Sequence, residues 1–233
     1  MIIQIYAFTD PRQAVAAVEM GVDNIGFIAG KYDIVYGELS FDEAKEIAKA
    51  LPPEGTSVAL TMSTDLDEIL RMAEYVEPDI VHISSEIDKV NMEMMHTLRE
   101  RMAPQIMLMK AIPVEDAKSI EKAKQYAQVS DLLLLDTSAK GFPGVGATGY
   151  THDWNISRRI VEEVNIPVIL AGGLSATNVK KAIEVVQPWG VDSNTSTNIE
   201  GSRVLKDMKR IEAFVKAVKQ SLNNKDDVGV IKK

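Results

Sequence analysis

The stretch PVILAGGLSATNVKKAIEVV, residues 167–186, contains one complete repeat of a pattern that runs along the whole chain. Its apolar run at 167–172 predicts a buried strand, its glycine pair predicts a tight turn, and Ser175 precedes apolar residues at helical spacing. Seven other short apolar runs are followed in the same way by helix-like segments. The strand candidates are 2–8, 24–29, 57–62, 79–84, 105–111, 131–136, 167–172 and 190–194.

Most of these runs are continuously apolar, which is typical of parallel strands covered on both faces. Eight strand–helix units predict an α/β fold, a single-domain (β/α)8 TIM barrel over residues 1–222, with a polar C-terminal tail at 223–233. A doubly wound open sheet is the alternative, but its glycine-rich first turn is missing here.

The composition narrows the function classes. The 233 residues carry a formal net charge of −8, which argues against nucleic-acid or anionic-membrane partners. The absence of cysteine excludes thiolate catalysis and Cys-ligated zinc. No signal-peptide pattern or membrane-length apolar run is evident, so we expect a cytoplasmic protein.

Active sites of such barrels form where the strands end, so polar residues there are the candidates. Gly172 and Gly173 form either a phosphate-binding turn before a helix or a turn that needs glycine only for its geometry. Asp192 ends the last strand, and the residues after it either complete a phosphate site or cap the local backbone. These residues are Ser193, Asn194 and Thr195.

Asp136 follows four leucines, so we expect a general acid or base whose pKa is raised by partial burial. The glycine-rich segment after it, with Gly141, Gly144, Gly146 and Gly149, is interpreted as a mobile lid. Lys110 ends another strand and either pairs with Asp136, binds substrate or forms a Schiff base, the last being the less favoured role.

Three histidines, His82, His96 and His152, lack the spacing of metal ligands, and we expect no metal site. Only His82 ends a predicted strand, where it can face the barrel or its mouth.

Taken together, four segments resemble the phosphoribosylanthranilate isomerase (TrpF) family of tryptophan biosynthesis. They are IIQIYAFTDPRQAVAAVEMGVDNIGFI (2–28), LLLLDTSAKGFPGVGATGYTHDW (132–154), ILAGGLSATNVKKAIEVVQPWGVDSNTS (169–196) and KDMKRIEAFVKAV (206–218). The resemblance implies a small phosphorylated substrate and an Amadori rearrangement, in which an acid opens a ribosylamine and a base removes a proton from C2. It places the acid at Asp136 and needs no cofactor.

The chain departs from this family at several positions. Tyr6 stands where the resemblance expects the catalytic cysteine, and a tyrosine is a weak base at neutral pH. Asp10, nearby, is expected to cap a helix. Gly37 stands where an arginine for the anthranilate carboxylate is expected, and His82-Ile83-Ser84-Ser85 and Ser193-Asn194-Thr195-Ser196 replace QLHG and SSG.

Three functions remain open on this basis. The chain is a divergent phosphoribosylanthranilate isomerase in which Asp192 or a water replaces the base. Alternatively, it is a paralogue that acts on another phosphorylated sugar or phosphate ester, with Asp136, Lys110 and Tyr6 as its polar groups. The third hypothesis is a non-catalytic barrel that binds a phosphate ligand.

Overall fold

The computed structural model describes residues 1–137, 145 and 151–228. Its strands are β1 (Ile2–Ile5), β2 (Asn24–Ala29), β3 (Glu38–Leu39), β4 (Thr56–Thr61), β5 (Ile80–Ile83), β6 (Met107–Pro113), β7 (Leu132–Asp136), β8 (Val168–Leu170) and β9 (Gly190–Ser193). Its helices are α1 (Pro11–Glu19), α2 (Phe41–Ala50), α3 (Leu66–Val76), α4 (Met92–Arg101), α5 (Lys118–Tyr126), α6 (Trp154–Glu163), α7 (Val179–Val186), the 3₁₀ turn η1 (Thr195–Thr197) and α8 (Met208–Val228).

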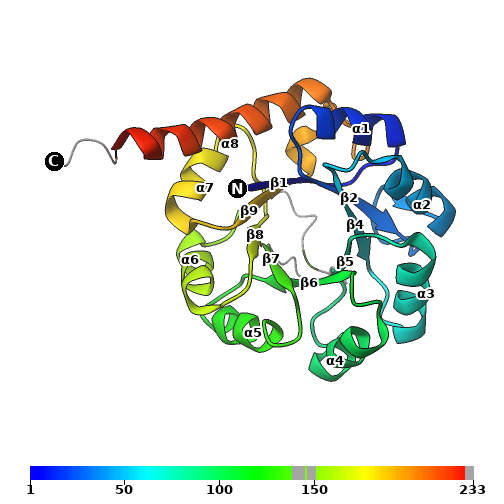
Figure 1. Cartoon of the computed structure of the whole chain (residues 1–233). Coiled ribbons are helices and arrows are strands. Elements are labelled where there is room, and N and C mark those ends of the chain that lie inside the picture. The colour runs from blue at the N-terminus through cyan, green and yellow to red at the C-terminus, as the bar shows by residue number, and fades with distance from the viewer. Residues whose placement is uncertain (138–144, 146–150, 229–233) are drawn as a thin grey trace.

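Eight parallel strands form a closed barrel with the helices around it (Figure 1). The order β1-β9-β8-β7-β6-β5-β4-β2 closes through a β1–β2 pairing, in which Gln4 lies opposite Asn24. The two-residue strand β3 pairs with the last two residues of β2, Ile28 and Ala29. The predicted (β/α)8 barrel is therefore confirmed.

Several helix starts follow directly from the sequence. Asp10 caps α1 by accepting from the N–H of Arg12, as expected, and Pro11 occupies the first turn. Ser40 and Glu43 have the three-residue spacing that predicts a capping box, and they form one at the start of α2.

Two helices begin later than predicted. The helix expected from Ser175 begins at Val179, because the Asn178 side chain accepts from Ser175 N–H and donates to the Gly173 carbonyl. Ser202 likewise precedes a long segment with apolar residues at helical spacing and so predicts a helix start, but the helix begins at Met208. It continues to Val228 and so includes the start of the segment predicted as a tail.

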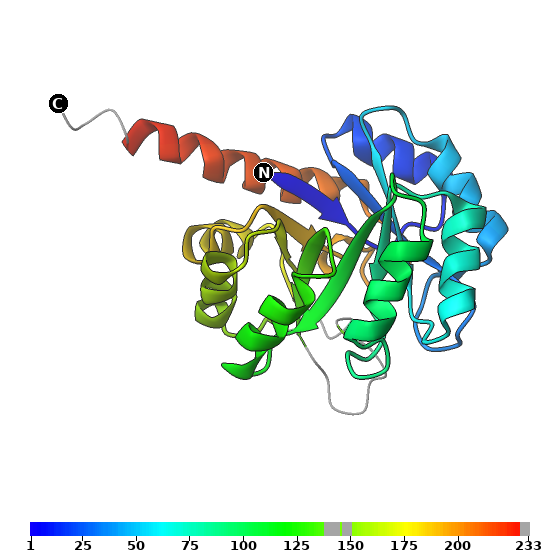
Figure 2. The same cartoon turned by 60° about the horizontal axis from the view of Figure 1, so that its bottom comes forward.

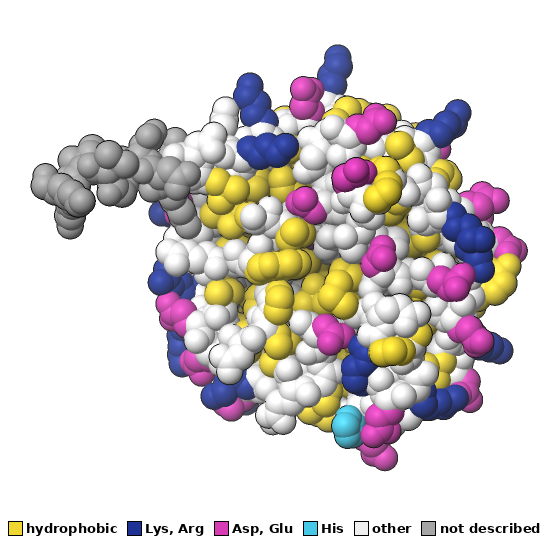
Figure 3. Space-filling model, in the orientation of Figure 1, with side chains coloured by type: hydrophobic (Ala, Val, Ile, Leu, Met, Phe, Trp, Pro, Cys, Tyr) yellow, Lys and Arg dark blue, Asp and Glu magenta, His cyan; other side chains and the backbone are white. Residues whose placement is uncertain are grey.

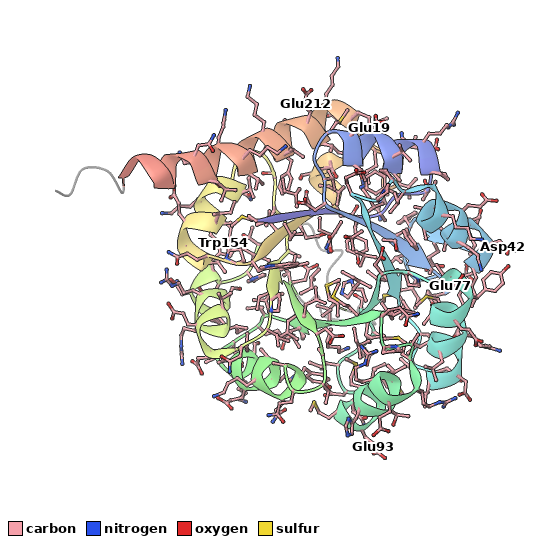
Figure 4. All side chains as sticks on the ribbon, viewed as in Figure 1. Glu19, Asp42, Glu77, Glu93, Trp154 and Glu212 are labelled. Atoms are coloured by element: carbon pink, nitrogen blue, oxygen red, sulfur yellow. The ribbon has the colours of Figure 1, made fainter. Side chains whose placement is uncertain are left out.

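Side chains alternate along each strand between two apolar layers. One layer fills the barrel interior, and the larger one lies between the strands and the helices. Figure 4 shows the interior filled with side chains, while labelled Glu19, Asp42, Glu93 and Glu212 lie at the periphery. This alternation decides which polar residue near a strand end can reach a ligand.

The two ends of the barrel differ in character. Figure 2 shows the N-terminus and the start of β1 on its upper side, which is the side that Figure 1 views from the front. On that face, apolar side chains gather over the centre and charged ones lie mainly around the edge (Figure 3). The strands end on the opposite face. Among the described residues, none of the helices combines the length and apolar character needed to cross a membrane.

Candidate active site

A cavity of about 740 Å³ lies at the carboxyl ends of the strands. Its walls come from the ends of β1, β2, β4, β5, β7, β8 and β9 and from the loops that follow them. Nine of the ten predicted site residues line it: Tyr6, His82, Asp136, Gly172, Gly173, Asp192, Ser193, Asn194 and Thr195. Inward-pointing residues of successive parallel strands converge at this end of such a barrel.

Asp136 is the last residue of β7 and is half-buried. Its Oδ1 accepts a hydrogen bond of 2.6 Å from the backbone N–H of Thr137. The same oxygen would lie 3.2 Å from a Cβ added at Gly172, so the glycine turn leaves room for this carboxyl group. Burial raises the pKa of Asp136 to about 7, and the Thr137 N–H opposes that rise. At neutral pH the group can therefore both donate and accept a proton.

Asp192 lies deeper in the barrel, on β9. Gln4 Nε2 donates to its Oδ1 at 3.1 Å, and Gln4 Oε1 accepts from Asn24 Nδ2 at 3.1 Å. Burial and the charge of Asp136 raise the pKa of Asp192 to about 8, while the Gln4 hydrogen bond and the charge of Lys206 oppose the rise. The two carboxyl groups interact, and near neutral pH they hold about one proton between them.

Tyr6 and His82 form a hydrogen-bonded pair on the cavity wall. The phenol oxygen of Tyr6 lies 2.8 Å from Nδ1 of His82. Burial, with the charge of Asp192, raises the pKa of Tyr6 well above its ordinary value, and burial, with the charge of Lys110, lowers the pKa of His82 to about 3. The phenol therefore keeps its proton, and a neutral imidazole accepts it as a hydrogen bond. Tyr6 at the cysteine position is consequently no general base at neutral pH.

Lys206 is a buried cation that the sequence reasoning missed. Its ammonium donates to the Tyr6 carbonyl, to Asn198 Oδ1 at 2.6 Å and to Asn194 Oδ1 at 3.1 Å. Burial lowers its pKa to about 7, and the charge of Asp192 opposes this. It ties the end of β1 to the loop after β9. Asn194 and Asn198, which supply two of its acceptors, are the sequence feature that could have indicated a buried cation here.

The glycine turn after β8 and the loop after β9 are joined by serine side chains. Gly172 and Gly173 have φ values of +84° and +61°, a region that favours glycine. The Leu174 carbonyl accepts from Ser193 Oγ at 2.9 Å and from Ser196 Oγ at 2.7 Å. These hydroxyls therefore brace the two loops against each other.

Lys110 is the predicted site residue that the structure places elsewhere. It lies on β6 between Met109 and Ala111, and its side chain points outward, toward Tyr126 of α5, with Nζ 5.8 Å from the ring centroid. The ammonium donates to the Ser85 carbonyl at 3.2 Å, and Lys110 is not among the described residues that line the cavity. The structure therefore does not place Lys110 beside Asp136 as predicted, because strand alternation puts position 110 on the outer face, and its predicted contact with substrate finds no support in this placement.

The rim of the cavity carries two further residues that were not predicted, Tyr36 and Arg203. The Arg203 guanidinium lies over the Tyr36 ring, 4.7 Å from its centroid. Tyr36 belongs to the segment between β2 and β3, and Arg203 belongs to the loop between β9 and α8. Arg203 was missed because Ser202 was interpreted as a helix start. The Ser202 hydroxyl instead accepts from the N–H groups of Val204 and Leu205 and closes a turn.

Gly37 stands where the resemblance expects an arginine, and the structure leaves little space for a side chain there. Its φ is +87°, and a Cβ added there would lie 3.3 Å from Cγ1 of Val204. The tip of the β9–α8 loop thus packs over this position. The expected lid, with Gly141, Gly144, Gly146 and Gly149, lies outside the described residues.

A closed (β/α)8 barrel with two interacting carboxyl groups and a braced glycine turn at its carboxyl end defines the class of barrel enzymes that act on small molecules by acid–base chemistry. The family model for N-(5'phosphoribosyl)anthranilate (PRA) isomerase matches residues 3–217. The chain belongs to this family, whose members are isomerases of tryptophan biosynthesis. The resemblance found in the sequence motifs is therefore confirmed.

Individual relatives agree with the family. The chain is 32% identical over 225 residues to N-(5'-phosphoribosyl)anthranilate isomerase of Haloferax volcanii, covering 97% of this chain and 96% of that one. It is 35% identical over 222 residues to the Methanocella arvoryzae isomerase, covering 93% and 97%.

Solved structures give the same result. The phosphoribosylanthranilate isomerase of Thermotoga maritima superposes with a TM-score of 0.79 at 28% identity, covering 94% of this chain and all of that one. Another isomerase structure, at 26% identity with a TM-score of 0.77 and the same coverage, was determined with reduced 1-(o-carboxyphenylamino)-1-deoxyribulose 5-phosphate.

Proposed function

We propose that this chain isomerises N-(5'-phosphoribosyl)anthranilate, with Asp136 and Asp192 as its acid–base pair. The observation that carries the proposal is the placement of these two carboxyl groups in the lining of one cavity, where burial raises their pKa values to about 7 and about 8. An Amadori rearrangement needs one protonated and one ionised group together, and such a pair supplies both.

The two carboxyl groups have different surroundings, and this difference assigns their roles. When Asp136 is protonated, its charge no longer raises the pKa of Asp192. The Asp192 carboxylate then has the Gln4 amide and the Lys206 charge to stabilise it. The Asp136 carboxylate, by comparison, is stabilised by the Thr137 N–H. Because the pKa of Asp136 is lower than that of Asp192, Asp136 is the stronger acid and Asp192 the stronger base, and we assign their roles in that sense.

The reaction then proceeds by ring opening, formation of an enolamine and its conversion to the ketone. Asp136 gives its proton to the ring oxygen of the ribosylamine as the bond from that oxygen to C1 breaks, which leaves a C1–nitrogen iminium ion. Asp192 removes the proton from C2, and the electron pair of that C–H bond forms the C1–C2 double bond of an enolamine. Asp192 returns its proton to C1, and the C2 hydroxyl gives up its proton to the ionised Asp136 as the C2–oxygen double bond of the ketone forms. Both carboxyl groups end in their starting states, so no atom is gained or lost and no cofactor is consumed.

The substrate's phosphate is assigned to the braced glycine turn. Gly172 and Gly173 allow backbone N–H groups to approach an anion closely, and Ser193, Asn194 and Thr195 form the facing wall. A small phosphorylated molecule bound there extends over the two aspartates.

Tyr6 and His82 are assigned a binding role. Because the Tyr6 hydroxyl donates to Nδ1, the neutral imidazole carries its proton on Nε2, for which the described residues provide no partner. We assign a substrate hydroxyl as the hydrogen-bond acceptor for this Nε2–H group.

The test is turnover of freshly prepared phosphoribosylanthranilate, followed by the loss of its fluorescence, in wild type, Asp136→Asn and Asp192→Asn. Each substitution should lower kcat on the order of 10²–10⁴-fold, the usual effect of losing an acid or base. Asp67→Asn, which changes an exposed carboxylate on α3, is the matched control and should match wild type. Wild-type protein that binds the substrate without turning it over would contradict the isomerase function.

A further inference from the structure

The loop between β9 and α8 carries a cation to the rim of the cavity. Asn198 and Lys206 pair as an antiparallel bridge, so the residues between them form a projecting turn. Val204, at its tip, packs over Gly37 in the segment between β2 and β3. This contact places the neighbouring residue, Arg203, at the rim of the cavity beside Tyr36.

Arg203 is the single Lys or Arg among the described residues that line the cavity. The ion pairs of the described residues do not include it with any carboxylate, and its side chain is exposed. Its guanidinium lies over the exposed Tyr36 ring, 4.7 Å from the centroid. Stacking uses the flat face of a guanidinium and leaves its N–H edge free for a planar anion.

The wall nearest this cation is apolar. Ile28, Ile34, Val35, Leu60 and Met62 line the cavity from the ends of β2 and β4 and from the segment that carries Tyr36. The glycine turn and the polar loop residues after β9 form another part of the lining. The cavity thus combines a polar anion site with an apolar wall that ends at a guanidinium.

The ligand named in the related structure has matching chemistry, with a phosphate at one end and a carboxylate on a phenyl ring at the other. We propose that Arg203 binds the aryl carboxylate of the substrate through its N–H edge, while the phenyl ring packs on the apolar wall. This inference rests on the proposed function and adds a specificity-determining residue to it. An arginine at position 37 would be strained at a φ of +87° and its Cβ would lie 3.3 Å from Val204 Cγ1, which is why we look to this loop for the guanidinium.

The segment that carries Tyr36 is held in place by Glu38. Its carboxylate accepts four backbone N–H groups, those of Tyr32 at 2.6 Å, Asp33 at 2.8 Å and Ile34 and Val35 at 2.9 Å each. Tyr36 is therefore preorganised beneath the guanidinium, which lowers the cost of ordering Arg203 when the carboxylate binds.

The experiment compares two probes by calorimetric titration: reduced 1-(o-carboxyphenylamino)-1-deoxyribulose 5-phosphate and its counterpart without the carboxyl group. Arg203→Gln should weaken binding of the first about 10- to 100-fold, the worth of charge-assisted hydrogen bonds, and should change binding of the second less than about twofold. Arg71→Gln, an exposed arginine on α3, is the matched control.

The outcomes separate the inference from the function on which it rests. Equal weakening of both probes by Arg203→Gln would assign the guanidinium to the phosphate or to loop structure and overturn the proposal, as would no weakening of either. Wild-type protein that binds the carboxylated probe selectively but does not turn over phosphoribosylanthranilate would overturn the isomerase function and leave the Arg203 site standing. Failure of the wild type to bind either probe would overturn both.

Discussion

The side chains of Tyr6 and His82 meet across the barrel interior, with the phenol oxygen 2.8 Å from Nδ1 and the ring centroids 5.6 Å apart. The first residue follows β1 and the second lies on β5, so the contact joins strands that are not neighbours in the sheet. Tyr6, which stands at the position of the family's cysteine, is therefore part of the cavity wall, and its phenol is held by His82. We therefore expect Asp136 and Asp192 to carry out the proton transfers of the proposed reaction.

Tyr6→Phe separates these roles, because phenylalanine keeps the ring and removes the hydroxyl. The buried Nδ1 of His82 loses its partner, so the free energy of unfolding should fall by about 1–3 kcal/mol. Turnover should fall by about tenfold or less, whereas loss of a general base costs on the order of 10²–10⁴. Urea denaturation and the fluorescence assay measure the two effects, with exposed Tyr75→Phe as control. A loss in the larger range would show that the phenol transfers a proton.

The pH profile of kcat/KM should report the shared proton of Asp136 and Asp192. Below about 7 both carboxyl groups are protonated and no base is available, and above about 8 both are ionised and no acid is available. We therefore expect a bell-shaped profile with its maximum between these values. The residual kcat/KM of Asp136→Asn should no longer show a bell-shaped dependence on pH. A wild-type profile that is flat from pH 6 to pH 9 would refute the shared-proton assignment.

Glu38→Gln tests the support of the rim. An amide nitrogen cannot accept a hydrogen bond, so two of the four backbone N–H groups lose their acceptor. The Tyr36 segment should loosen, which should raise KM several-fold and leave kcat close to wild type. Steady-state kinetics check this split, with exposed Glu74→Gln as the matched control. A fall in kcat at unchanged KM would instead connect Glu38 to the chemical step.

The parts of the site that the sequence predicted are those determined by strand ends and glycine turns. Asp136 follows four leucines, and Gly172 and Gly173 follow an apolar run, so their location at the carboxyl end of the barrel depends only on the parallel strand–helix repeat. Lys110 follows an equally apolar run, but its direction depends on register. One residue of shift exchanges the inside and the outside of a strand.

Long-range contacts account for the residues that were missed. The sequence around Ser202 has the composition of a helix start, and a buried Lys206 with amide partners in the preceding loop turns it into a projecting turn instead. Arg203 reaches the cavity only because that turn crosses to the β2–β3 segment. No local pattern contains this information, since the partner positions are distant in the sequence.

Lys110 provides a last test, because it is buried outside the cavity. Burial lowers its pKa to about 7 from an ordinary value of 10.5, so between these values the unfolded chain binds more protons than the folded one and stability rises with pH. Lys110→Met removes the cost of burying the ammonium. Its stability advantage over wild type should therefore be largest below pH 7 and should shrink as the pH approaches 10. Urea denaturation at pH 6 and pH 9.5 measures the change, with exposed Lys180→Met as control.

Turnover by Lys110→Met should remain at the wild-type level, since the Lys110 side chain points toward α5. If Lys110→Met abolished turnover while preserving the fold, the lysine would have to reach substrate, and its outward placement would be refuted.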